Sequence, residues 1–239
     1  MKKYGYNSGY IGVDRRTTEA GTISYQKRML EREANRMRMA GVDIHRDGLV
    51  LGLLAENLTD QISDGWTDSS ANGYNYSIGG GPVITANSYM KFLNIDSTDD
   101  YLDPPIGMNP LGSSAGTAVF VMSSTDSQGL FFTQGGGPFL AAYRSGNTMY
   151  HSGYGNSILH YHNKVLKNNV YANFRDGAWN MTEFKNIERN SSTGWQAFNY
   201  STYEIVGKIR ALLIYNKVLT ADESTQNYDY FLGRGYFSE

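Results

Sequence analysis

After Gly48 the chain becomes a succession of short apolar or alternating runs, separated by clusters of Gly, Asn, Asp and Ser. Runs of this kind are typical of β-strands, and the clusters between them are typical of turns. A single helical pattern follows the last run, which excludes folds that alternate strands with helices. The sequence therefore predicts an all-β fold, a two-sheet antiparallel sandwich of the jelly-roll kind. We expect its strands over residues 49–54, 89–95, 117–122, 130–133, 139–143, 148–151, 157–163, 170–175, 195–198 and 203–215.

The last of these runs, 203–215, is the clearest strand. Lys208 and Arg210 occupy one face at its start, and Leu212 and Ile214 continue the same face in apolar form. This change is typical of a strand that runs from the rim of a sheet into its middle. We therefore expect Arg210 near the rim.

A short C-terminal helix follows that strand. Thr220 and Glu223 have the spacing of a capping box, which marks a helix N-terminus. Phe231 and Leu232 contribute to an apolar helical face, and Gly233 is a stop signal. The pattern predicts a helix that begins after Thr220 and ends at Gly233.

Composition excludes several function classes. The 239 residues include no Cys, so disulfides, thiolate metal sites and cysteine nucleophiles are excluded. No apolar run approaches the roughly 18 residues that a membrane-spanning helix needs, and we expect no membrane partner. The basic start of the chain is followed by no apolar stretch, which predicts synthesis in a cytoplasm without a signal peptide.

Charge is divided unevenly along the chain. Residues 1–46 carry a net charge of +5, and the remainder carries −7. A basic arm on an acidic body indicates a separate partner for the arm, an acidic protein surface or nucleic acid, unless arm and body attract each other. Nucleic acid is disfavoured because Glu31 and Glu33 interrupt the basic helix and no DNA-reading motif is present.

Residues 1–46 are predicted to form an anchoring arm and helix. Residues 1–23 are rich in Gly and Tyr and are expected to be extended, and a helical pattern runs from Ser24 to Gly41. An isolated helix of this length is marginal in water, so it needs a docking partner or copies of itself. The side chains expected to bind a partner or a second copy are Tyr4, Tyr6, Tyr10, Ile11, Arg15, Arg16, Lys27, Arg28, Leu30, Ala34 and Met37.

Three segments carry motifs of a known family. A W-x-D-x-S-x-N-G loop at 66–73 follows an opening strand, a strand with an acidic turn spans 90–102, and a closing strand with a helix spans 209–223. Together they resemble the laminin G-like (concanavalin A-like) sandwich domains, in that family's order and spacing. The resemblance implies a jelly-roll domain over residues 47–239.

The arm resembles the N-terminal segments of tailed-bacteriophage virion proteins that carry such a domain. The similar residues are Gly9-Tyr10-Ile11-Gly12, Gly21-Thr22-Ile23-Ser24 and Glu31-Arg32. This resemblance implies that the arm binds other virion proteins in the head, neck or tail. Copies of the chain are expected to associate through the helical stripe of Leu30, Ala34 and Met37, which predicts a homo-oligomer, a trimer if the protein is built like a phage fibre.

Enzymatic chemistry is not expected. Some proteins with this sandwich are glycanases, which use two carboxylates about 5 to 9 Å apart. The sequence has no alternating acidic motif, because Glu183 and Glu188 are five positions apart and would face opposite sides of one strand. We predict that the protein is not an enzyme.

Two groups of side chains have the residue types that bind metals. Asp96, Asp99 and Asp100 carry the oxygens that Ca²⁺ prefers, but caps on the backbone of their own turn explain Asp96 and Asp99 more simply. His160 and His162 share one strand face with His151 nearby in sequence, and a half-exposed strand explains them without a metal. We predict no metal and no other cofactor.

Glycan binding is the alternative function. Aromatic rings are surfaces on which sugars stack, and four candidates stand in the second half of the chain: Tyr154, Tyr161, Trp179 and Trp195. The competing explanation is that such rings fill a large two-sheet core. The sequence thus predicts a non-enzymatic component of a tailed-phage virion (a fibre, neck or head decoration protein), with an adhesin that binds host surface glycans as the alternative.

Overall fold

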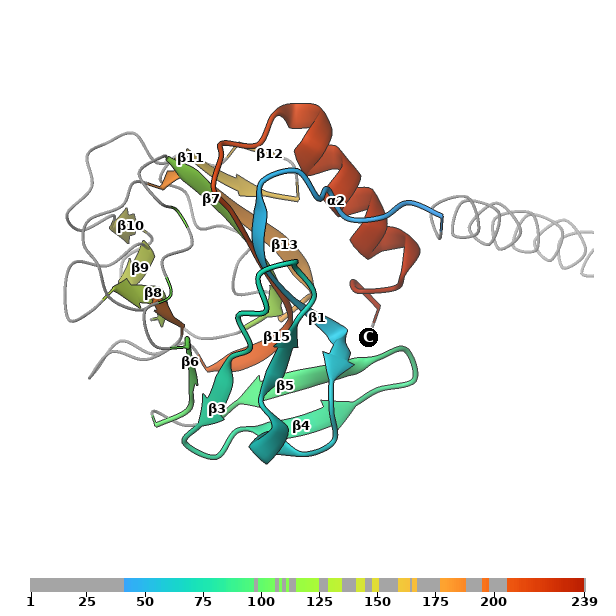
Figure 1. Cartoon of the computed structure of the whole chain (residues 1–239), viewed down its shortest axis with the longest axis vertical. Coiled ribbons are helices and arrows are strands. Elements are labelled where there is room, and N and C mark those ends of the chain that lie inside the picture. The colour runs from blue at the N-terminus through green and yellow to red at the C-terminus, as the bar shows by residue number, and fades with distance from the viewer. Residues whose placement is uncertain are drawn as a thin grey trace, which may run out of the picture.

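In the computed structural model, the described part of the chain forms two antiparallel β-sheets from the short apolar runs, with one α-helix beside them (Figure 1). This is the predicted all-β jelly-roll sandwich, and that prediction is confirmed. The structure describes residues 41–96, 99–105, 108, 111, 115–124, 129–134, 141–144, 148–150, 159–163, 165–166, 177–187, 195–197 and 206–238.

The larger sheet has nine strands. Its main path runs in the order β12-β11-β13-β7-β15-β1-β2, and β5 also pairs with β15 and carries β4 at its edge. The central pair, β7 and β15, holds buried side chains on both faces. The strands are β1 (Leu49–Leu58), β2 (Trp66–Asp68), β4 (Val83–Ala86), β5 (Lys91–Ile95), β7 (Gly116–Ser123), β11 (Leu159–His162), β12 (Val165–Leu166), β13 (Asn180–Ile187) and β15 (Gly207–Tyr215).

The smaller sheet has six strands in the order β10-β9-β8-β14-β6-β3. Neighbouring strands of this sheet pair in the antiparallel sense. The strands are β3 (Ser77–Gly79), β6 (Tyr101–Asp103), β8 (Gly129–Gln134), β9 (Ala141–Arg144), β10 (Thr148–Tyr150) and β14 (Trp195–Ala197).

A hydrophobic core fills the space between the two sheets. From the large sheet, Phe120, Phe184 and Leu212 contribute fully buried side chains, and Leu102 of β6 meets them from the small sheet. The rings of Phe120 and Phe184 pack edge to face with centroids 6.0 Å apart. Burial of this apolar surface is the main force that holds the sheets together.

The outer face of the large sheet is covered by α2 (Ala221–Gly233) and the segment that follows it (Figure 1). The capping box predicted at Thr220 and Glu223 is present, and the helix ends at Gly233 as predicted. Tyr230 and Phe231 are buried against the sheet, whereas Leu232, predicted for the apolar face, is 45% exposed.

The sequence predicts Arg210 near the rim of the sheet, but its side chain is buried under the C-terminal segment. The pairing of β15 with β7 shifts register between Ile209 and Ala211, so Arg210 is the extra residue of a β-bulge. The bulge directs its side chain beneath the C-terminal segment, where it is completely buried. Its Nη1 donates hydrogen bonds of 2.7 Å to the carbonyls of Tyr236 and Ser238.

The W-x-D-x-S-x-N-G loop is built around one buried carboxylate. Asp68 accepts hydrogen bonds from the backbone N–H groups of Gly52, Ser70 and Tyr74, each at 2.8 Å. Trp66 is fully buried, and its indole N–H donates to the Leu54 carbonyl at 2.9 Å. The motif therefore ties the loop to β1, which is a structural role.

The sandwich begins before residue 47. Ile44 is 1% exposed within the outer-face core, and the N–H of His45 donates to Asn227 of α2 at 2.8 Å. The side chain of Gln226 donates to the carbonyl of Asp43 at 3.0 Å. These residues run alongside α2 (Figure 1), so the boundary of the packed domain precedes the predicted division at 46/47.

Several strands were not predicted from the sequence, most notably β13, an interior strand of the large sheet. Its outer face carries Glu183 and Lys185, which masked the apolar alternation. The short strands β2, β3, β4, β6 and β12 were also missed. The strand expected at 170–175 lies outside the described residues.

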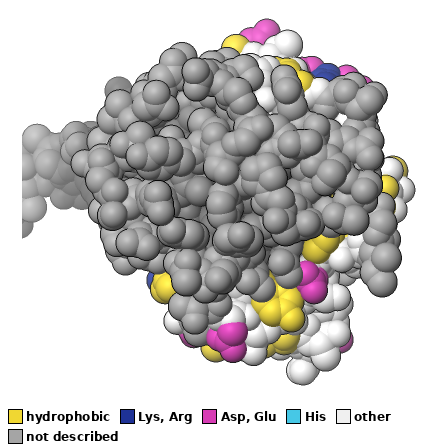
Figure 2. All heavy atoms as spheres, turned by 90° about the vertical axis from the view of Figure 1, so that its left-hand side faces the viewer, with side chains coloured by type: hydrophobic (Ala, Val, Ile, Leu, Met, Phe, Trp, Pro, Cys, Tyr) yellow, Lys and Arg dark blue, Asp and Glu magenta, His cyan; other side chains and the backbone are white. Residues whose placement is uncertain are grey.

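The described surface is mixed in character. Figure 2 shows acidic and hydrophobic side chains near one another along the margins of one face. Exposed large hydrophobic residues include Val83, Tyr89, Val206, Val218 and Leu232. Within the described part of the chain, α2 is too short and too polar to cross a membrane.

Candidate functional site

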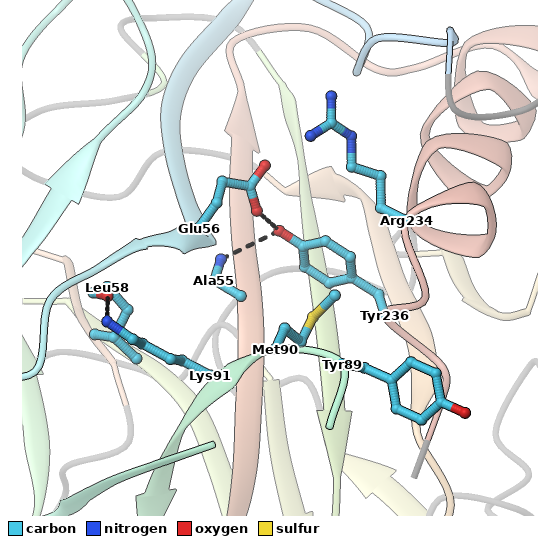
Figure 3. A pocket seen from close by; sticks show the side chains of 8 residues that line it. All are labelled: Ala55, Glu56, Leu58, Tyr89, Met90, Lys91, Arg234 and Tyr236. Carbon is cyan, nitrogen blue, oxygen red and sulfur yellow. Dashed lines mark hydrogen bonds between the residues drawn. The ribbon is translucent and has the colours of Figure 1, made fainter. Parts of the chain in front are cut away.

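A hollow of about 310 Å³ opens where the end of β1, the start of β5 and the segment after α2 meet (Figure 3). It combines aromatic, aliphatic and charged groups, a mixture found in sites that bind small polar ligands. The residues that line it are Ala55, Glu56, Leu58, Tyr89, Met90, Lys91, Arg234 and Tyr236.

Two tyrosine hydroxyls hold the carboxylate of Glu56. Tyr230 donates to one oxygen and Tyr236 donates to the other, and the Tyr236 hydroxyl also accepts a 3.1 Å hydrogen bond from the Ala55 N–H (Figure 3). Burial raises the pKa of both phenols, and the adjacent Glu56 carboxylate raises them further. The hydroxyls therefore stay protonated and fix Glu56 at the edge of the hollow.

The turn between β4 and β5 presents Tyr89. The side chain of Asn87 accepts hydrogen bonds from the N–H groups of Tyr89 at 3.0 Å and Met90 at 3.1 Å, which fixes the turn. Tyr89 is 50% exposed. In Figure 3 its ring stands at one side of the hollow with its hydroxyl directed away from the other labelled residues.

Two cations complete the lining. Lys91 donates to the Leu58 carbonyl at 3.2 Å and pairs with Asp60 at 2.9 Å. Arg234 lies over the ring of Tyr230 at 5.0 Å, and its guanidinium makes no hydrogen bond or ion pair to the residues that the structure describes. The guanidinium therefore has donors that are open to a ligand.

A second charged cluster lies under α2 and serves packing. Lys185 pairs with Glu183 at 2.9 Å and donates to the Leu219 carbonyl at 2.6 Å and the Ser224 hydroxyl at 2.8 Å. Burial raises the pKa of Glu183, and Lys185 and Ser224 act against that rise. The two ions are buried and paired with each other, and Lys185 connects the sheet to Leu219 and Ser224 at the start of the helix.

A third cluster has ligand types that suit a metal. Ligand atoms of His45, Asp47 and Glu223 lie within 4.8 Å of one another. The ammonium of Lys217 binds both carboxylates, at 2.7 Å to Glu223. Burial alone would raise the pKa of Glu223, but hydrogen bonds from Lys217 and Thr220 lower it to about 2. Lys217 thus occupies the place that a cation would take.

The predicted glycan-binding rings lie in different environments in the structure. Trp179 is 7% exposed, with the Arg210 guanidinium 3.8 Å from the centroid of its ring and Phe92 packed edge to face. Arg210 and Phe92 cover most of this ring, an environment that matches the competing explanation of rings that fill the core. Tyr161 is half-buried in β11 beside Lys185.

The other two predicted glycan-binding side chains lie outside the described residues. Trp195 begins β14, but its side chain lies outside the described residues, as does the whole of Tyr154. The arm residues, from Tyr4 to Met37, are also outside the described residues. Their predicted roles stay predictions.

The cap observed in the acidic turn after β5 comes from Asp100, whereas the sequence predicts caps from Asp96 and Asp99. The Asp96 N–H donates to the fully buried Asp100 carboxylate at 2.9 Å, so Asp100 is the residue that caps the turn. Asp96 and Asp99 are exposed. His160 and His162 fall in β11 with side chains outside the described set, as is His151.

Sequence reasoning missed the lining of the hollow. Its residues come from three places, 55–58, 89–91 and 234–236, and no spacing in the sequence links them. The one available signal was Tyr89, an aromatic residue in a polar turn after Asn87.

Comparisons with known proteins support the fold. No known protein family and no curated protein matches the sequence. Trypanosoma rangeli sialidase in complex with sialic acid is 9% identical, with a TM-score of 0.51 over 87% of this chain and 39% of that one. The binding domain of Paraclostridial Mosquitocidal Protein 1 is 12% identical, with a TM-score of 0.51 over 81% of this chain and 53% of that one.

A third similar structure is shorter. Domain 4 of AbnA, an extracellular arabinanase from Geobacillus stearothermophilus, in complex with arabinotriose, is 15% identical, with a TM-score of 0.48 over 79% of this chain and 100% of that one. The chain spans well under two thirds of the sialidase and of the mosquitocidal binding domain. At these identities the likeness establishes the jelly-roll sandwich and nothing finer.

Proposed function

We propose that this chain is a carbohydrate-binding domain, and that its ligand occupies the hollow between β1, β5 and the C-terminal segment. The observation that carries the proposal is that one hollow is lined by the half-exposed ring of Tyr89, the fixed carboxylate of Glu56 and the open donors of Arg234. A sugar ring offers an apolar face to an aromatic side chain and hydroxyls to charged groups, so this lining matches both.

The similar structures support this class of ligand. The sialidase is known in complex with sialic acid, and its fold is shared with this chain over most of the chain's length. Because the chain covers only 39% of that enzyme, its hydrolytic activity is not part of the proposal.

The proposed role is binding without cleavage. Glycosidases need a pair of carboxylates about 5 to 9 Å apart at the bond that breaks. Among the residues that line the hollow, Glu56 alone carries a carboxylate, and both its oxygens accept hydrogen bonds from tyrosines. The lining thus supplies no acid and nucleophile pair.

The test is a glycan array probed with the whole chain and with Tyr89→Ala. We expect binding to a defined set of glycans, and a loss of about tenfold in affinity for the variant, since exposed aromatic anchors dominate such sites. Val218→Ala, a truncation at another exposed apolar side chain, is the matched control and should bind normally. Equal binding by Tyr89→Ala, or no glycan retained by the unmodified chain, would contradict the proposal.

A structural role in a tailed-phage virion stays a prediction from the sequence of residues 1–46, most of which lie outside the described residues. Glycan binding and virion display are compatible, because the arm and the hollow are separate parts of the chain. Deleting residues 1–23 tests the anchor: particles should then lack the protein while its sandwich stays folded.

A further inference from the structure

We infer that the hollow selects an acidic saccharide, one whose sugar ring carries a carboxylate, such as a uronate or a sialate. This inference rests on the proposed function and adds the chemical class of the ligand. It follows from the charges of the lining, which are two cations, Lys91 and Arg234, and one anion, Glu56.

Arg234 is the group that would recognise the carboxylate. Its guanidinium is exposed and stacks over Tyr230 at 5.0 Å, which orients its plane without using its N–H donors. A planar guanidinium binds a carboxylate through two parallel hydrogen bonds, an arrangement stronger and more selective than a bond to a neutral hydroxyl. The positive charge of Arg234 also helps to lower the pKa of Asp43. The Asp43 carboxylate, however, accepts a hydrogen bond from Arg46 at 3.2 Å.

Lys91 is the second cation, and its present partner is replaceable. Asp60 pairs with it at 2.9 Å, but the Asp60 side chain is 81% exposed. An exposed ion pair of this kind contributes little free energy. A second carboxylate, carried by another ring of an oligosaccharide, can therefore take the place of Asp60 at small cost, while the Leu58 carbonyl keeps the ammonium in position at 3.2 Å.

Glu56 offsets only one of the two positive charges in the lining. Each of its oxygens accepts a hydrogen bond from a tyrosine hydroxyl, one from Tyr230 and one from Tyr236. The hydroxyl dipoles disperse the negative charge, and the carboxylate is tied to the C-terminal segment. Glu56 remains an acceptor for a sugar hydroxyl at the side of the hollow away from Lys91 (Figure 3).

The experiment compares two pairs of ligands, each an acid and the methyl ester that removes its charge. Oligogalacturonide and its methyl ester have the same rings and hydroxyls, and sialyllactose and its methyl ester form a second pair. Isothermal titration of the whole chain should show at least one acid bound about tenfold more tightly than its ester, the size expected for one charge-assisted contact. The preference should fall as NaCl rises from about 0.05 to 0.5 M, since exposed charges are screened.

Variants identify the groups responsible. Arg234→Gln should remove most of the preference, so that the acid binds about as weakly as the ester, and Lys91→Gln should reduce the preference further. Lys208→Gln, which removes an exposed charge outside the hollow, should change neither.

The two proposals fail in different ways. If acid and ester bind equally while Tyr89→Ala still weakens both, the acidic ligand is wrong and carbohydrate binding in the hollow stands. If neither these ligands nor any glycan on the array binds, the proposed function is wrong as well. If the acid is preferred but Arg234→Gln leaves that preference intact, the assignment to this hollow is overturned.

Discussion

The two faces of the large sheet are built by different means. The face toward the small sheet is filled with aliphatic and aromatic side chains, among them Phe120, Phe184 and Leu212. The face under α2 is also apolar, but it buries Glu183, Lys185 and Arg210. The inner face depends on shape and volume alone, whereas the outer face also depends on polar partners for its buried charged residues.

The partners of these charges come from the end of the chain. Lys185 bonds to Leu219 and Ser224, and Arg210 bonds to the carbonyls of Tyr236 and Ser238. Burial lowers the pKa of Arg210 to about 10. The outer face therefore depends on correct docking of the last twenty residues, and the candidate glycan hollow, which uses Arg234 and Tyr236, depends on the same docking.

The largest effect is expected on the inner face. Phe120→Ala removes a fully buried ring that packs on Phe184, and it should reduce the free energy of unfolding by about 4 kcal/mol. Urea unfolding measures this loss. Leu232→Ala, at an exposed apolar position, should change stability by less than about 0.5 kcal/mol. Similar losses for the two variants would contradict the placement of the core.

A somewhat smaller effect is expected on the outer face. Lys185→Met leaves Glu183 buried without its cation, which should cost about 3 kcal/mol at pH 8. Burial already raises the pKa of Glu183, so the folded state holds a proton to higher pH than the unfolded state does. The free energy that this proton contributes to the folded state falls as pH rises above the pKa of Glu183 in the unfolded chain. The fall should be larger without Lys185.

The loss for Lys185→Met should thus be smaller at pH 5 than at pH 8, measured as the difference from the unmodified chain. Adding Glu183→Gln should recover part of the stability, because no charge then remains unpaired. A loss that is independent of pH, with no recovery in the double variant, would show that packing and not charge governs this face.

The smallest effect is expected where the outer face meets the hollow. Tyr236→Phe keeps the ring packed on Phe231 but removes the bonds to Glu56 and to the Ala55 N–H, at a cost of about 1 kcal/mol. Burial raises the pKa of Tyr236 well above 10, so the unfolded phenol ionises first and stability falls above pH 10.

This alkaline loss should be weaker in Tyr236→Phe, and chemical denaturation at pH 8 and 10.5 measures the difference. Tyr89→Phe, which alters the hydroxyl of an exposed tyrosine, is the control and should match the unmodified chain. An unchanged pH dependence in Tyr236→Phe would mean that this hydroxyl does not hold the C-terminal segment.

Local patterns predicted the fold class and several elements well. The capping box at Thr220 and Glu223 and the stop at Gly233 mark α2 because each depends on neighbours within one turn. The central strand β7 was predicted within a residue of each end, since its apolar run has no competing interpretation. Strand β13 was missed because Glu183 and Lys185 stand at buried positions, where sequence patterns assume apolar residues.

The sequence by itself determined that this chain forms an all-β sandwich closed by one capped helix, because strand alternation and helix capping act over a few residues. Only the tertiary structure decided that Trp179 lies in the core, that Arg210 lies beneath the C-terminal segment, and that Glu56, Tyr89 and Arg234 line one hollow. Those outcomes depend on a register shift and on contacts between residues more than a hundred positions apart, and no local pattern encodes which distant partner a side chain meets.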